Sequence, residues 1–382
     1  MDMMQSAAAP VQEARTSRAL VLSGGIAMGA FAAGACAALE EAGGPPPSHL
    51  AGSSAGALTA ALIAGNPPGR RVERLRAFWE SVALDPTPAT SALLGPPPAG
   101  GAWRRAYNRA AVLQSLLLGR PGLYRPRLAL PWSIGQAPAL YDLAPLLQRL
   151  RSSVDFDRLN SGETRLAIAA TDVVSGERVV FDTGRGDRIG PEHVVASCAL
   201  LPIFAPIEVE GRLLADGGLA SNAPLDLVLD EPGEGEVLCF VVELFARAGT
   251  RPRTLTDAAS RAGDLAFGNQ TRRILEGQIR EHRLRALVAD LVERLPEEVR
   301  QDPALAARLR DAAGGGRGAT VVMLGYHAGL DEAGLGKAFD FSPATLRDRW
   351  RGGEARMREA LARLEADAPP RARPGLRLVE VG

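Results

Sequence analysis

Residues 49–62 read His49-Leu50-Ala51-Gly52-Ser53-Ser54-Ala55-Gly56-Ala57-Leu58-Thr59-Ala60-Ala61-Leu62 and contain the pattern Gly-x-Ser-x-Gly. A short apolar run before it and a small-residue helix pattern after it predict a sharp strand-to-helix turn with Ser54 at its apex. Gly52 and Gly56 would remove side chains that collide with neighbouring backbone at such a turn. Ser54 would also stand at a helix N-terminus, where unpaired N–H groups favour negative charge. We predict that Ser54 is a nucleophile, against the alternative that the pattern arises by chance in an Ala/Gly-rich chain.

A second glycine-rich turn lies upstream, at Ser23-Gly24-Gly25-Ile26-Ala27-Met28-Gly29. It joins the apolar run 19–22 to a small-residue helix pattern, so its backbone N–H groups can converge on an anion. A dinucleotide fingerprint would need glycine in place of Ile26, and a P-loop would need Lys-Ser/Thr at residues 30–31. Neither phosphate motif is therefore present. The remaining predictions are an oxyanion hole formed by Gly24, Gly25, Ile26 and Ala27, or simple close packing of the helix.

An acidic residue marks the end of a predicted hairpin further along the chain. This hairpin, residues 207–214, runs into Asp216-Gly217-Gly218. Gly217 and Gly218 would let the strand end approach another backbone closely, which suits a catalytic carboxylate. Asp216 is therefore predicted as a base, and a turn capped by aspartate is the alternative.

The composition excludes several classes of protein. The 382 residues include 44 basic and 44 acidic ones and are 46% hydrophobic, which indicates a globular chain without a charged field for nucleic acid. Lys337 is the only lysine, which removes P-loop and Schiff-base chemistry elsewhere in the chain. Cys36, Cys198 and Cys239 stand in apolar surroundings without metal-ligand spacing. We expect buried thiols in a reducing compartment, no metal and no cofactor.

Several stretches carry expectations about organisation. Residues 1–17 lack the features of a signal peptide and are expected to form a flexible tail. No run of about 18 apolar residues occurs, so we expect a cytoplasmic protein whose membrane contact, if any, is peripheral. Segment 85–138 is rich in proline and glycine and favours a lid-like insertion, with a surface excursion as the alternative. The apolar residues there that would suit a lipid surface are Trp103, Tyr107, Leu116, Leu117, Leu118, Tyr124 and Trp132, among Arg104, Arg105, Arg109, Arg120, Arg125 and Arg127.

Five segments recur together, and in this order, in one known family. They are residues 22–31, residues 52–56, Ala170-Thr171-Asp172 with Ser175-Gly176, residues 196–199 with 202–206, and residues 216–225. Together they resemble the patatin-like phospholipase family. The resemblance implies an α/β fold, a three-layer α/β/α domain over residues 18–245 with a mainly parallel central sheet. It also implies lipid acyl hydrolysis, with acyl esters as substrates, by a catalytic dyad of Ser54 and Asp216.

Two positions depart from the family pattern, which usually has glycine in place of Ile26 and often a basic residue in place of Met28. Backbone N–H groups survive either change, so we expect the oxyanion hole to persist if Ile26 keeps an allowed φ. Residues 246–368 resemble the mostly helical C-terminal extension of a bacterial subgroup. Residues 369–382 are expected to form a frayed tail.

Two other readings remain open. An α/β-hydrolase triad has the chain order Ser, acid, His, and His327 after Asp216 would satisfy it. His49 and His193 do not fit that order. A catalytically degenerate, lipid-binding module is the second alternative, because Ile26 and Met28 depart from the family.

Overall fold

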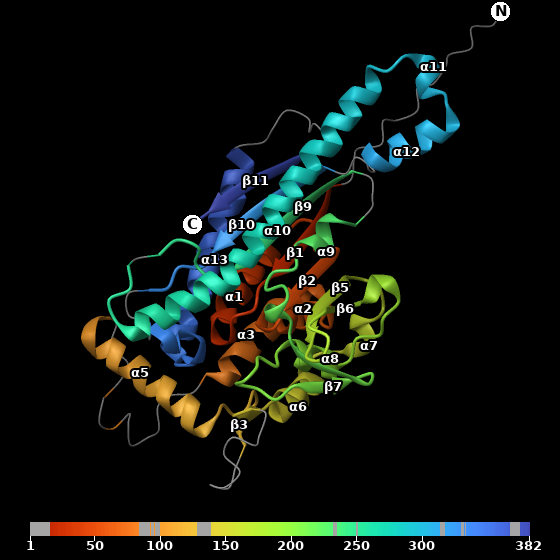
Figure 1. Cartoon of the computed structure of the whole chain (residues 1–382). Coiled ribbons are helices and arrows are strands. Elements are labelled where there is room, and N and C mark those ends of the chain that lie inside the picture. Colours follow the sequence, from red (N-terminus) through yellow and green to blue (C-terminus); the bar gives the residue numbers. More distant parts are fainter. Residues whose placement is uncertain are drawn as a thin grey trace, which may run out of the picture.

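The computed structural model describes residues 16–83, 92, 95, 100–127, 139–231, 235–249, 251–313, 318–329, 332, 334–366 and 375–382. Its centre is a nine-stranded sheet of described strands in the order β11-β10-β9-β1-β2-β5-β8-β7, with β6 also paired to β5 (Figure 1). The strands from β11 to β5 are mutually parallel. The pairs of β5 with β6, β5 with β8, and β7 with β8 are antiparallel. The bounds are β1 Thr16–Leu22, β2 His49–Ser53, β5 Arg165–Asp172, β6 Arg178–Asp182, β7 Ile207–Val209, β8 Arg212–Asp216, β9 Glu236–Glu243, β10 Gly318–Gly325 and β11 Leu376–Val381; β3 Arg125–Pro126 and β4 Tyr141–Asp142 pair separately.

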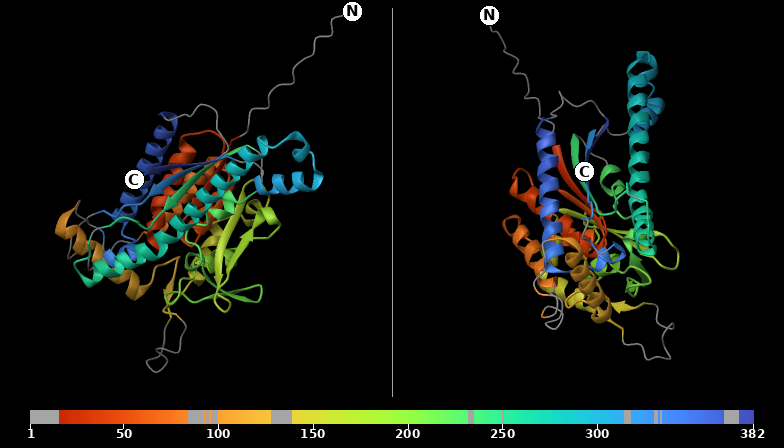
Figure 2. Two further views of the ribbon diagram at one scale, coloured as in Figure 1. Left: turned by 45° about the horizontal axis from the view of Figure 1, so that its top comes forward. Right: turned by 90° about the vertical axis from the view of Figure 1, so that its left-hand side faces the viewer.

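Helices cover both faces of this sheet. Figure 2 (right) shows the sheet between α13 on one side and α10 on the other. The helices are α1 Gly29–Glu41, α2 Ala55–Ala64, α3 Arg71–Val82, α5 Gly101–Leu118, α6 Ala144–Ser153, α7 Phe156–Leu159, α8 Pro191–Ser197, α9 Asp226–Leu229, α10 Leu255–Glu293, α11 Glu297–Arg300, α12 Pro303–Ala313 and α13 Pro343–Ala366. Single 3-10 turns are η1 Ile26–Met28, η2 Pro68–Arg70, η4 Thr183–Arg185, η5 Gly217–Leu219 and η6 Gly334–Phe339.

The central strands are apolar throughout because both of their faces are buried. In β1, Leu20 and Leu22 point into the larger core with α1, α2 and α13, whereas Ala19 and Val21 point into a smaller core with α9 and α10. This alternation is the period of two that an extended strand imposes. The predicted three-layer α/β/α arrangement with a mainly parallel sheet is confirmed.

The C-terminal part of the chain belongs to the same core. Helix α13 packs along α1 so closely that a Cβ on Gly34 would lie 2.1 Å from the Trp350 carbonyl oxygen. A Cβ on Gly353 would lie 2.0 Å from the carbonyl oxygen of Phe31. Both positions require glycine because the two backbones are nearly in contact.

Two expectations about the ends of the chain need correction. The tail expected at 369–382 is wrong for Leu376–Val381, which form β11 and pair in parallel with β10. The tail expected at 1–17 already contains Thr16 and Ser17 of β1, which pair with β9, and residues 1–15 lie outside the described residues. Strands β10 and β11 extend the sheet of the first half, so the region after 245 is mostly helical but also supplies two strands.

Candidate active site

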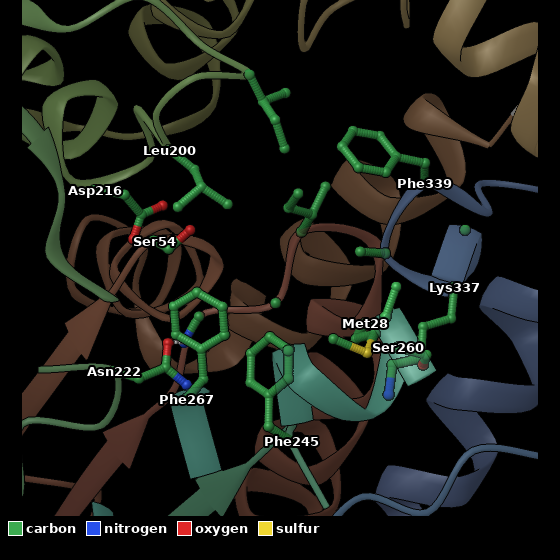
Figure 3. Close-up of a pocket in the computed structure, with 18 of the residues that line it drawn as sticks. Met28, Ser54, Leu200, Asp216, Asn222, Phe245, Ser260, Phe267, Lys337 and Phe339 are labelled. Atoms are coloured by element: carbon green, nitrogen blue, oxygen red, sulfur yellow. Dashed lines mark hydrogen bonds between the residues drawn. The ribbon is translucent and has the colours of Figure 1, made fainter. Parts of the chain in front are cut away.

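The topology brings two functional residues to the same place. Strand β2 runs parallel to β5 with Ser53 beside Ala169, and β8 runs antiparallel to β5 with Asp216 beside Ala170. Ser54 comes just after β2, and Asp216 is at the end of β8. The two residues therefore lie on either side of the same point on β5. Figure 3 shows their side chains next to each other at one end of a cavity.

Ser54 occupies a strained turn between β2 and α2. Its φ of 56° and ψ of −125° are unusual for a residue with a side chain. A Cβ at Gly52 would lie 2.7 Å from the Ala57 nitrogen, and one at Gly56 would lie 1.9 Å from the Leu22 carbonyl oxygen. Only glycine therefore fits on either side of Ser54. This is the geometry that exposes a serine hydroxyl at the top of a sheet.

The backbone of Ser54 is held by a serine on α8. The Ser54 N–H donates to Ser197 Oγ at 2.9 Å, and that hydroxyl donates to the Ala169 carbonyl at 2.6 Å. Ser197 therefore ties the turn to β5.

Asp216 is a buried carboxyl with few polar neighbours. Its Oδ1 accepts a hydrogen bond from the Gly218 N–H at 2.7 Å, and its main-chain carbonyl accepts one from Thr171 Oγ1 at 2.8 Å. Burial raises the pKa of Asp216 to about 7, although hydrogen bonds from the Ser54 hydroxyl and the Gly218 amide act to lower it. A carboxyl with a pKa in this range can exchange a proton near neutral pH.

The glycine-rich turn after β1 closes over Ser54. A Cβ on Gly24 would lie 2.8 Å from the Ser54 Cβ. The Gly24 N–H is already directed at Asn222, at 3.2 Å from Oδ1 and 3.3 Å from the main-chain oxygen. Within the described part of the chain, the N–H groups of Gly25 and Ile26 have no acceptor. Of the predicted donors, Gly25 and Ile26 thus have amides free to bind an anion.

Ile26 reaches this arrangement with a φ of 50°. A positive φ is a rare outlier for a β-branched residue, because its Cβ crowds the backbone. This explains in physical terms why glycine would suit the position.

The cavity beside Ser54 has a volume of about 540 Å³, within the range of ligand sites in proteins. Ser54 and Asp216 lie at one end, and Lys337 lies at the other (Figure 3). The walls come from α5, α10, η6 and the segment after α8. The apolar lining residues are Ile26, Met28, Val112, Leu116, Leu200, Ile203, Phe245, Phe267, Ala338 and Phe339. The site therefore suits a substrate with a large apolar part.

Other residues named from the sequence lie elsewhere. His327 lines two different cavities and is absent from the lining of the one that contains Ser54 and Asp216. The ring of His193 packs against Phe181 at 4.4 Å, and its Nδ1 accepts from the Gly190 N–H at 2.9 Å, which is a structural role. His49 is buried at the start of β2, at the other end of that strand from Ser54. None of the four histidines of the chain lines the cavity that contains Ser54 and Asp216.

The insertion 85–138 contributes to the site only in part. Val112 and Leu116 of α5 line the cavity, and Trp103, Leu117 and Leu118 are exposed. The expectation of a lipid-facing surface is wrong for Tyr107, Tyr124, Arg104 and Arg120, whose side chains are buried. Trp132 lies outside the described residues, as do much of 84–99 and all of 128–138.

Several residues of the site were not predicted. Ser197, Thr171 and Asn222 lie within the segments that carried the family resemblance, so their signal was present but was given no role. Phe267 and Phe339 lie in the region after residue 245. The sequence pattern there predicts helices but does not show which side of a helix faces the cavity. Among the described residues, no group of three or more metal-ligating side chains is suitably placed for a metal ion. In the same part of the chain, no helix has the length and apolar character needed to cross a bilayer.

A serine and an acid at the ends of two strands that flank a third, in a mostly parallel α/β sheet, are an arrangement suited to serine hydrolases. Comparison with known families is consistent with this class. A family described as patatin-like phospholipase matches residues 20–229, and one described as patatin phospholipase matches residues 265–373. The first match covers more than half of the chain, which therefore belongs to the patatin-like phospholipase family. Membership supports hydrolysis of lipid acyl esters as its activity.

Among solved structures, VipD from Legionella pneumophila is 15% identical, with a TM-score of 0.40, over 91% of this chain and 67% of VipD. The heterodimeric complex ExoU-SpcU from the type III secretion system of Pseudomonas aeruginosa contains a chain that is 17% identical, with a TM-score of 0.28, over 94% of this chain and 73% of that one. TM-scores this low support no inference about fold or function. No curated protein matches the sequence significantly.

Proposed function

We propose that the chain hydrolyses carboxylic esters of lipids through a dyad of Ser54 and Asp216. The observation that supports this most is the pairing of a serine at a strained turn with a buried acid whose pKa is raised to about 7. As a carboxylate, Asp216 accepts the Ser54 proton while Oγ attacks the ester carbonyl carbon. The N–H groups of Gly25 and Ile26 donate to the resulting oxyanion.

The remaining steps return both residues to their starting state. The bond to the alcohol oxygen breaks, Asp216 gives its proton to the departing alcohol, and the acyl group stays on Ser54. Water then loses a proton to Asp216 and attacks the acyl carbon, and the bond to Ser54 Oγ breaks. Asp216 returns the proton to Ser54, and the carboxylic acid leaves.

Substitution of the two residues tests the dyad. We expect Ser54→Ala and Asp216→Asn each to lower kcat/KM for para-nitrophenyl butyrate by at least about a hundredfold with folding intact. A fluorophosphonate probe should label the wild type and the matched control Ser53→Ala, but not Ser54→Ala. Retained activity in Ser54→Ala would disprove the proposal. A folded wild type that takes no label would favour the lipid-binding module.

His327→Ala distinguishes the dyad from a triad. We expect it to retain the activity of the wild type, because His327 does not line the cavity of Ser54. A loss as large as that of Asp216→Asn would instead support a triad.

We also propose that lipid reaches the cavity from the side of α5. Leu117 and Leu118 are about two-thirds exposed at the end of the helix whose Val112 and Leu116 line the cavity. Exposed leucines beside a lipid-binding cavity suit a peripheral contact with the membrane surface.

A further inference from the structure

Ser54 borders two cavities, not one. The second has a volume of about 50 Å³ and is also lined by Ser54. Its walls come from α2, α3, the segment before β3, the start of α6 and the loops around Phe204 and Phe341. The residues that line it are Ile26, Ser54, Ala55, Leu58, Phe78, Trp79, Leu123, Tyr124, Leu143, Leu146, Cys198, Phe204 and Phe341.

Only Ile26 and Ser54 line both cavities. Because Ser54 provides the reacting atom, Ile26 is the other residue whose replacement could change how the two spaces are divided. It is half-buried and packs against the main core, which fixes its position. Its φ of 50° turns the side chain to a direction that an ordinary φ would not allow.

The two cavities differ in size by about tenfold but share an apolar character. The carbon attacked by Ser54 carries two substituents, the acyl chain and the alcohol oxygen with its chain. The large cavity has room for a long chain. The small one has room for only a few heavy atoms, and the buried aromatic side chains of Phe78 and Trp79 are among the residues that line it.

We propose that Ile26 is a specificity-determining residue that keeps these cavities apart. The ester site then accepts one long substituent, in the large cavity, and one short substituent, in the small cavity. This rests on the proposed ester hydrolysis at Ser54. Removing the Ile26 side chain would join the two spaces and admit esters that are long on both sides of the carbonyl carbon.

Three simple esters separate the possibilities. Hexyl hexanoate is long on both sides, whereas ethyl hexanoate and hexyl acetate are long on one side only. We expect the wild type to hydrolyse at least one of the short-sided esters well and hexyl hexanoate poorly. Ile26→Ala should raise the kcat/KM of hexyl hexanoate relative to the better short-sided ester by about tenfold or more, the discrimination that small changes in an apolar pocket produce. Ile26→Val, which removes one methyl group, should give a smaller change in the same direction.

Leu200→Ala is the matched control, because Leu200 lines the large cavity alone. It should leave the ratio of hexyl hexanoate to the short-sided ester unchanged. An unchanged ratio in Ile26→Ala, or an equal rise in Leu200→Ala, would overturn the role of Ile26 while Ser54-dependent hydrolysis still stood.

A binding measurement tests the partition without turnover. In the Ser54→Ala background, bound 12-bromododecanoic acid should leave the emission of Trp79 unchanged while Ile26 is present. Adding Ile26→Ala should let the chain end reach the small cavity and quench Trp79, and the added quenching should vanish with Trp79→Phe. Equal Trp79 quenching with and without Ile26 would refute the partition, whatever the result for hydrolysis.

Discussion

Ser54 and Ile26 are two residues with side chains that both have a φ near +50°. Backbone in this region costs on the order of 1–3 kcal/mol for each residue and persists only where the surroundings fix it. Here the surroundings are Gly52, Gly56 and the Ser197 hydroxyl around Ser54. Two of the three described non-glycine residues with a positive φ would thus contact the scissile carbonyl, and the third, Glu210, lies in the turn between β7 and β8.

The pKa of Asp216 predicts how activity depends on pH. Burial raises the pKa to about 7, and the proposed base acts only as a carboxylate. We therefore expect kcat/KM for para-nitrophenyl butyrate to rise with pH through about 7 and then to level off. Circular dichroism at each pH would check that the protein stays folded. A constant rate across this range would contradict the assignment of Asp216 as the base.

A second buried acid predicts how stability depends on pH. Burial raises the pKa of Glu243 to about 7, although hydrogen bonds from Thr271 and nearby main-chain amides lower it. The folded state therefore holds a proton that the unfolded chain, with a glutamate pKa of about 4.3, has lost. The free energy of unfolding must fall as pH rises between these two values.

Glu243→Gln should remove this contribution. We expect its free energy of unfolding in urea to fall less than that of the wild type between about pH 5 and about pH 8. Asp216, whose pKa is also raised, would still make the free energy of unfolding depend on pH in both proteins. The exposed Glu298→Gln is the control and should follow the wild type. A variant as pH-sensitive as the wild type would show that Glu243 keeps an ordinary pKa.

At the scale of elements, η6 and α10 form the wall of the cavity opposite Ser54. A buried ion pair joins them, with Lys337 Nζ at 2.6 Å from Asp264 Oδ1. Arg349 of α13 holds η6 in place, since it donates hydrogen bonds to the Lys337 carbonyl at 2.7 Å and to Glu332 at 2.9 Å. The only lysine of the chain thus has a structural partner.

Arg349→Met tests how strongly α13 supports this wall. The change would leave Glu332, whose side chain is 12% exposed, without its cation. Removing one partner of such a largely buried pair typically costs about 3–5 kcal/mol. We expect a reduction of that size in the free energy of unfolding, measured in urea. The exposed Arg347→Met on the same helix should change little. A small effect of Arg349→Met would mean that Glu332 is neutralised by other means.

The sequence predicted the elements around the dyad because short-range patterns determine them. Apolar runs ending in glycine-rich turns located the ends of β1, β2 and β8. Strand β11 was missed although Leu376-Arg377-Leu378-Val379-Glu380-Val381 partly alternates, because the adjoining Pro/Arg-rich segment dominated the interpretation. The cavity walls could not be predicted, since they depend on how α5, α10 and η6 pack against segments far away in sequence. The burial of Arg104 and Arg120 was missed for the same reason.

At the scale of the whole molecule, two pairs of exposed leucines lie at distant places. Leu117 and Leu118 lie at the end of α5 near the cavity, and Leu284 and Leu287 lie in the second half of α10, toward α11 and α12 (Figure 1). Their exposed fractions are similar, 65% and 63% for the first pair and 62% and 54% for the second. The two pairs therefore separate the effect of position from that of hydrophobicity.

Replacing Leu117 and Leu118 together by serine tests the proposed lipid contact. We expect slower hydrolysis of phospholipid vesicles and an unchanged rate on para-nitrophenyl butyrate, because only the first substrate requires an interface. The matched variant Leu284→Ser with Leu287→Ser should behave as the wild type on both. Equal rates of all three proteins on vesicles would place the lipid contact elsewhere.

The parallel pairing of β10 with β9 and of β11 with β10 adds late parts of the chain to the central sheet. This order matters while the protein is being synthesised. Strand β9, which pairs with β1, begins more than two hundred residues after β1 ends. Helix α13, which packs against α1, begins a hundred residues after β9 ends. Contacts this distant in sequence make folding slow and expose apolar surface until they form. A chain still on the ribosome that ends before η6 has Ser54 and Asp216 but no complete cavity around them. We therefore expect nascent chains to remain inactive until residues beyond about 340 have emerged, so that the enzyme would attack lipid only once translation has passed that point.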